Sequence, residues 1–123
     1  MSKTGPLPLS VAIIGGGFAG IGTAIRLKQK RIDNIAVFER GTAVGGTWRD
    51  NTYPGAACDI PSRLYSYSFA PNPDWSHTYS GSAEILQYIE RMVEDFGVRP
   101  FLRLGHNVTG VSWIDAEQVW ELS

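Results

Sequence analysis

Glycines at a fixed spacing stand near the start of the chain, in the stretch VAIIGGGFAGIG (residues 11–22). Gly15, Gly17 and Gly20 follow the pattern G-x-G-x-x-G, after an apolar run and before an amphipathic one. In this pattern the first glycine allows a tight turn, the second lets a pyrophosphate approach the main chain, and the third lets helix and strand pack closely. The spacing therefore predicts that a dinucleotide phosphate binds here, at a helix N-terminus with free N–H groups.

An acidic residue, Glu39, follows about twenty residues beyond the glycines, at the end of a second apolar run. Its carboxylate is suited to accept hydrogen bonds from the ribose hydroxyls of an adenosine. It would also repel a 2′-phosphate, so NADP is not expected at this first site. Spacing alone does not choose NAD over FAD, and the alternative is that the glycines serve only close packing without a ligand.

A strand, a turn and a helix must position these residues, and the hydrophobic pattern predicts all three. Residues 9–14 form a short β-branched apolar run that ends at glycine, and the spacing of apolar residues from Ala19 onward suits a helix. Residues 34–40 predict a second buried strand, which completes a βαβ unit. The fold class is therefore α/β, a Rossmann-like dinucleotide-binding βαβ unit with a parallel sheet.

The remaining sequence predicts an irregular connection, another helix and short strands. Residues 41–80 are rich in proline, glycine and aromatic residues, which indicates an ordered loop with about one helical turn. A helix is expected from Ser82, as N-cap with Glu84 in the first turn, to Gly97 as terminator. A third strand and the two arms of a β-hairpin follow, at residues 98–105, 107–114 and 119–123. Because the last strand ends with the chain, we expect residues 1–123 to be the N-terminal part of a longer protein.

Composition excludes several classes of function. The 123 residues carry 11 basic and 12 acidic side chains and a net charge of -1, which argues against a nucleic-acid partner. The single cysteine, Cys58, cannot form an intrachain disulfide, and no Cys/His cluster has metal-ligand spacing, so we expect no metal site and a reducing, cytoplasmic location. The uncharged N-terminal run is too short to span a bilayer. Nothing in the sequence indicates an oligomeric state.

A second set of motifs chooses between the cofactors. They lie in residues 41–69 and comprise Gly45-Gly46-x-Trp48, Tyr53-Pro54-Gly55, Cys58-Asp59, Ser62 and Tyr65-Ser66-Tyr67-Ser68-Phe69. This segment resembles the one that follows the FAD fingerprint in class B flavoprotein monooxygenases, which include the Baeyer–Villiger and flavin-containing monooxygenases. The resemblance extends over essentially the whole chain, so it implies the N-terminal part of an incomplete FAD-binding domain.

The resemblance implies a specific chemistry. In the family, NADPH reduces bound FAD, and the reduced flavin forms a C4a-peroxide with dioxygen that inserts one oxygen atom into a ketone, amine or sulfide. The cofactor performs the chemistry, and protein groups orient and shield it. Asp59 is implied as a catalytic residue beside the flavin, holding an arginine outside this chain, and residues 57–59 would border the nicotinamide. The cofactor-binding residues implied are Gly15, Gly17, Ala19, Gly20, Glu39, Arg40, Gly46, Thr47, Trp48, Ala57, Cys58, Asp59, Tyr65 and, through its backbone, Val108.

Several of these residues have a structural alternative. Trp48 and Tyr65 suit core packing as well as cofactor lining, Cys58 suits a small buried residue, and Asp59 suits a turn. The family's second glycine fingerprint, which binds NADPH, is absent from these 123 residues, so we expect the isolated chain to lack catalytic competence. The alternative function is a stand-alone small FAD- or nucleotide-binding module. Arg49-Asp50 and Ile60-Pro61 depart from the pattern of ketone-oxidising members, which leaves the substrate class open.

Overall fold

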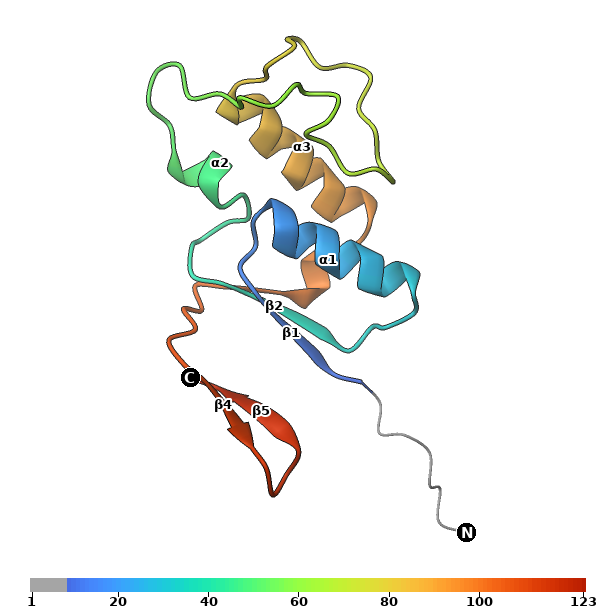
Figure 1. The fold of residues 1–123 in the computed structure, drawn as a ribbon, viewed down its shortest axis with the longest axis vertical. Coiled ribbons are helices and arrows are strands. Elements are labelled where there is room, and N and C mark those ends of the chain that lie inside the picture. Colours follow the sequence, from blue (N-terminus) through green and yellow to red (C-terminus); the bar gives the residue numbers. More distant parts are fainter. Residues whose placement is uncertain (1–8) are drawn as a thin grey trace.

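The computed structural model describes residues 9–123 and confirms the α/β class (Figure 1). Strand β1 (Val11–Ile14), helix α1 (Phe18–Gln29) and strand β2 (Ile35–Glu39) form the predicted βαβ unit. Strand β3 (Leu102–Leu104) completes a three-stranded parallel sheet with the order β1-β2-β3. The carboxyl ends of β1 and β2 lead directly into the two loops that carry the predicted glycines and the segment after Glu39.

One face of the sheet is covered by α1, against which helix α3 (Ser82–Asp95) packs (Figure 1). The strands bury alternate side chains, as period-two alternation requires: Ile13, Ile35 and Val37 face the helices. They meet the buried faces of the two helices, whose members include Ile21, Ile25, Ile85, Ile89 and Val93. The core therefore lies between the sheet and the helices and holds the strands in position.

The opposite face is more open. Ala12 and Ile14 point away from the helices and are exposed. A separate antiparallel hairpin of β4 (Val111–Ile114) and β5 (Val119–Leu122) lies on this side, with its two tryptophans, Trp113 and Trp120, paired across the strands. An apolar groove of about 780 Å³ runs between β1 and this hairpin.

The long connection is ordered, as predicted, and holds one short helix, α2 (Thr47–Asp50). Its second half is closed by Ser62 and Ser80, two buried residues whose hydroxyl oxygens are 2.6 Å apart. Its middle is fixed to α3, because the hydroxyl oxygen of Tyr88 accepts from the backbone N–H of Tyr67 at 3.0 Å. These contacts hold residues 62–80 in place, although this segment contains no helix or strand.

Helix α3 begins at Ser82, as predicted, but the predicted N-cap and the predicted bounds of the third strand are wrong. Gly81, and not Ser82, is the N-cap of α3, and no side-chain hydrogen bond from the described part of the chain caps this end of the helix. The Glu84 carboxylate instead accepts from the backbone N–H of Ser76 at 2.9 Å. The predicted third strand is shorter than residues 98–105, because a 3-10 turn (Arg99–Phe101) that contains Pro100 precedes β3. Proline has no N–H to donate to a strand ladder, which accounts for the shorter strand.

Candidate dinucleotide-binding site

Two of the three glycines of the motif have a geometric reason to be glycine. Gly15 has a φ of +102°, a conformation that L side chains rarely adopt. At Gly20 an added Cβ would lie 1.9 Å from the carbonyl oxygen of Gly15, so the first turn of α1 packs directly on the loop. Gly17 has ordinary backbone angles, and the nearest atom to an added Cβ would be Gly46 Cα, at 3.6 Å. The backbone conformation therefore requires glycine at position 15 and local packing requires it at position 20, whereas Gly17 has room for a methyl group.

The N-terminus of α1 opens onto this loop. Gly17 is its N-cap, and within residues 9–123 no side chain caps it and no acidic residue lies in its first turn. The first backbone N–H groups of a helix have no partner inside the helix, and the helix dipole adds a partial positive charge there. An uncapped N-terminus of a 12-residue helix beside a glycine loop can therefore bind an anionic group such as a pyrophosphate.

Two adjoining hollows lie along the glycine loop and share Ile14, Gly15, Gly17, Gly46 and Thr47. The first, here called the Glu39 hollow, has a volume of about 430 Å³. The second, here called the Trp48 hollow, has a volume of about 370 Å³. The predicted residues that line the Glu39 hollow are Gly15, Gly17, Glu39, Arg40, Gly46, Thr47 and Val108. The predicted residues that the Trp48 hollow adds are Ala19, Gly20, Trp48 and Tyr65.

Glu39 lies at the end of β2, and its side chain is buried, with 5% of its surface exposed. Its Oε2 accepts from the backbone N–H of Gly16 at 2.7 Å, and its Oε1 accepts from the backbone N–H of Gly41 at 2.9 Å. The carboxylate therefore reaches back into the glycine loop and also forms part of the wall of the Glu39 hollow. A hydrogen bond to an ionised acceptor is short and strong, so this side chain is firmly held.

Trp48 and Tyr65 form the aromatic wall of the Trp48 hollow. The indole N–H of Trp48 donates to the hydroxyl of Tyr65 at 3.1 Å, and the two ring centroids are 5.6 Å apart. Tyr65 also packs on Phe18, the first residue of α1, with a centroid distance of 4.8 Å. Both rings are partly buried against the core and line the hollow, so packing and lining, the two interpretations of the sequence, are both consistent with the structure.

A tyrosine supports the Trp48 hollow from behind. The hydroxyl of Tyr67 donates to the backbone carbonyl of Phe18, and the centroids of the two rings are 4.4 Å apart. Burial raises the pKa of Tyr67 well above its usual value, and the neighbouring Tyr88 raises it further. Tyr67 is therefore a neutral hydrogen-bond donor that fixes the start of α1.

The structure also brings to the hollows residues that were not predicted to bind the cofactor. Phe18 and Gly45 line the Trp48 hollow, and Phe38, Asp50, His106 and Asn107 line the Glu39 hollow. His106 and Asn107 follow the carboxyl end of β3. Since ligands of open parallel sheets bind at the carboxyl ends of the strands, a third parallel strand ending near residue 104 was a usable signal for them.

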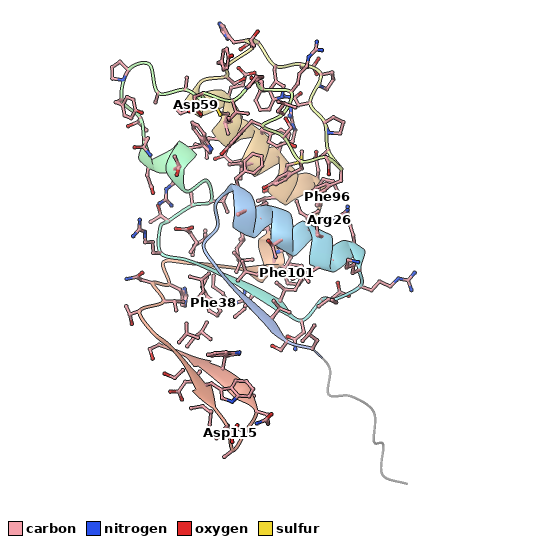
Figure 2. The ribbon with its side chains drawn as sticks, in the orientation of Figure 1. Arg26, Phe38, Asp59, Phe96, Phe101 and Asp115 are labelled. Carbon is pink, nitrogen blue, oxygen red and sulfur yellow. The ribbon has the colours of Figure 1, made fainter. Side chains whose placement is uncertain are left out.

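Three predicted residues lie apart from both hollows. Ala57 pairs with Gly81 at the start of α3, and the N–H of Cys58 donates to the carbonyl of Ser80 at 3.0 Å. Cys58 is buried, as its structural interpretation expects, while Asp59 is exposed. Figure 2 shows Asp59 near the N-terminal end of α3, well separated from Phe38 in the Glu39 hollow. The roles of these three residues at a flavin or nicotinamide remain predictions.

Within residues 9–123, no group of His, Cys, Asp and Glu side chains is arranged to hold a metal ion. In the same part of the chain, no helix has the length and apolar character needed to cross a membrane. Besides backbone groups and aromatic rings, the two hollows are lined by the polar side chains of Glu39, Arg40, Thr47, Asp50, His106 and Asn107.

Residues 13–81 match the family described as NAD(P)-binding Rossmann-like domain, which is more than half of the chain. The chain belongs to this family. A Baeyer–Villiger monooxygenase of Streptomyces coelicolor is 53% identical over 113 residues, which cover 91% of this chain and 22% of that protein. The resemblance to class B flavoprotein monooxygenases, N-terminal segment, is therefore confirmed.

Solved structures give the same result. Cyclohexanone monooxygenase from Rhodococcus sp. Phi1, bound to NADP+, superposes with a TM-score of 0.86 at 36% identity over 93% of this chain and 22% of that one. OTEMO in complex with FAD and NADP superposes with a TM-score of 0.85 at 31% identity over 94% of this chain and 22% of that one. The chain thus spans about one fifth of the length of the proteins that it matches.

Proposed function

We propose that this chain is the FAD-binding part of a flavoprotein monooxygenase that depends on NADPH and dioxygen. One observation carries the proposal: the glycine loop, the uncapped N-terminus of α1, Glu39 and the Trp48–Tyr65 pair, all expected at an FAD site, line two adjoining hollows. The monooxygenase relatives support it, because 53% identity extends over nearly the whole chain.

The residues present fit the cofactor. Gly17 and the α1 N-terminus suit the pyrophosphate, since the loop there lacks side chains and offers N–H groups. Glu39, with lone pairs beyond those bonded to Gly16 and Gly41, suits the hydroxyls of the adenosine ribose. The Trp48 hollow suits the ribityl and flavin end, where aromatic rings provide apolar contact.

The cofactor would supply the redox chemistry when bound: FAD takes electrons from NADPH and activates dioxygen. The groups of this chain would bind and orient it and exclude water around it. We further propose that the substrate is a small molecule with a ketone, amine or sulfide group, and that Asp59 acts beside the flavin. Cys58, a free buried thiol, fits a reducing cytoplasm.

A flavin-retention experiment tests the proposal. The purified chain is mixed with excess FAD and desalted, and the flavin absorbance that elutes with folded protein is measured. Gly17→Ala is the test variant, because its added Cβ has room beside Gly46 but stands on the wall of both hollows. Gly110→Ala is the matched control, since its added Cβ would meet only Ser123, at 3.8 Å.

We expect the unsubstituted chain and Gly110→Ala to retain FAD and Gly17→Ala to lose it while keeping the same circular dichroism spectrum. Folded chain without retained flavin would contradict the proposal and favour a pyridine nucleotide or a packing role for the glycines. Equal retention by Gly17→Ala would place the flavin elsewhere on the protein and would contradict the assigned site.

A further inference from the structure

Three loops that are distant in sequence meet at Glu39. The carboxylate bonds the backbone N–H of Gly16, in the glycine loop, at 2.7 Å, and that of Gly41, in the segment after β2, at 2.9 Å. The main-chain carbonyl of Glu39 accepts from the N–H of His106, in the segment after β3, at 3.0 Å. One residue thus contacts each of the three segments that form the Glu39 hollow.

Further backbone hydrogen bonds join the same segments to one another. The N–H of Gly45 donates to the carbonyl of Gly16 at 2.9 Å, and the N–H of Gly105 donates to the carbonyl of Gly41 at 2.9 Å. Gly16 lies so close to Glu39 that an added Cβ would meet Oε2 at 3.1 Å. The carboxylate therefore lies inside this network and does not hang free in the hollow.

The chemistry of the carboxylate suits this position. An ionised carboxylate accepts at about four lone-pair sites, of which the two loop amides occupy two. A backbone N–H buried beside an acceptor that no longer accepts would lose its partner, at the cost of an unsatisfied buried donor. The two amides and the carboxylate thus depend on each other in the protein without a ligand.

We propose that Glu39 is a positioning residue that shapes the glycine loop before the dinucleotide binds, in addition to its expected contact with the ribose. The dinucleotide part of this statement rests on the proposed function, whereas the loop part concerns the ligand-free chain alone. If Glu39 served only the ribose, its replacement would leave the loops of the free protein unchanged.

Amide hydrogen exchange of the ¹⁵N-labelled chain without flavin separates these cases. In Glu39→Gln the amide group keeps the size of the side chain but one of its two acceptor atoms becomes a donor. We expect the Gly16 or Gly41 N–H, or both, to exchange about tenfold faster or more, as loss of a hydrogen bond to a charged acceptor implies.

The matched control is Glu84→Gln, which makes the same change at the start of α3. The Glu84 carboxylate also accepts a backbone N–H, that of Ser76, at 2.9 Å. It should speed exchange at Ser76 and leave Gly16 and Gly41 unchanged. If Glu39→Gln does not fold, the unsubstituted chain still decides, because Gly16 and Gly41 must then show slowed exchange without ligand.

Unchanged exchange of both glycine amides in folded Glu39→Gln would overturn the proposal, as would unprotected amides in the unsubstituted chain. FAD retention, measured in parallel, keeps the two proposals apart. Faster exchange in a chain that does not retain FAD would support the positioning role and contradict the proposed function. Retained FAD with unchanged exchange would support the proposed function and contradict the positioning role.

Discussion

Substitution of Gly20 by alanine gives a sharp test of the packing between the glycine loop and α1. The added Cβ would lie 1.9 Å from the carbonyl oxygen of Gly15. This oxygen belongs to the backbone and cannot rotate away, so the loop or the helix must move. The substitution therefore changes the stability of the ligand-free chain, independently of any cofactor.

The magnitude follows from two opposing terms. Overpacking of this severity costs about 3 kcal/mol, the upper end of its usual range. Alanine in place of glycine inside a helix recovers about 1 kcal/mol. The free energy of unfolding should then fall by about 2 kcal/mol, which lowers the Tm of a domain of this size by about 8 °C.

Thermal and urea unfolding followed by circular dichroism measure this change. Gly110→Ala is the control, because its Cβ would meet only Ser123 at 3.8 Å, and its free energy of unfolding should stay within about 0.5 kcal/mol of the original. A Gly20→Ala chain as stable as the unsubstituted one would refute the close packing of α1 on Gly15 and, with it, the geometric account of the third glycine.

Three further predictions concern the loop, α3 and the hairpin. Burial raises the pKa of both Tyr67 and Tyr88, so the stabilisation from their protonated forms is fully present below about pH 10 and is lost as the pH rises further. The free energy of unfolding should therefore fall above about pH 10, and these two side chains should form tyrosinate only together with unfolding. Hydrogen bonds from Ser76 hold the pKa of Glu84 below its usual value of 4.5, so the stabilisation that they give is present above that pH and is lost as the pH falls. Glu84→Gln should lower the free energy of unfolding by about 0.5 kcal/mol near neutral pH and reduce its dependence on pH in acid. An unchanged dependence on pH in acid would contradict this role. Trp120→Ala should lower the free energy of unfolding by about 1 kcal/mol and remove the near-ultraviolet circular dichroism signal of its pair with Trp113. FAD retention should stay unchanged.

The βαβ unit was predictable because its signals are local. The glycine spacing, the β-branched run before Gly15 and the helical spacing after Ala19 all act within a few residues, and the structure places β1, α1 and β2 accordingly. The N-cap of α3 was not predictable in the same way. Ser82 is a good N-cap by type, but its N–H donates to the carbonyl of Ala56, and the pairing of Ala57 with Gly81 makes Gly81 the cap.

The residues of the candidate site were predictable where they belong to a sequence motif. They were not predictable where only the order of the strands brings them to the site. Most of the motif residues, including Gly17 and Trp48, line the two hollows, whereas Phe38 and His106 reach the Glu39 hollow only because β2 and β3 are neighbours. A sequence motif also assigns one role to a residue. It gives Glu39 to the ribose, and only the fold shows the bonds to Gly16 and Gly41.

The order β1-β2-β3 explains why a single carboxylate can organise the Glu39 hollow. In a parallel sheet the carboxyl ends of all strands lie at one edge, and Glu39 ends the central strand, so the loops after β1 and β3 flank it on either side. A substitution of the central strand's last residue is therefore expected to disturb the walls of the hollow on both sides, whereas Gly17→Ala affects only the surface that the ligand meets.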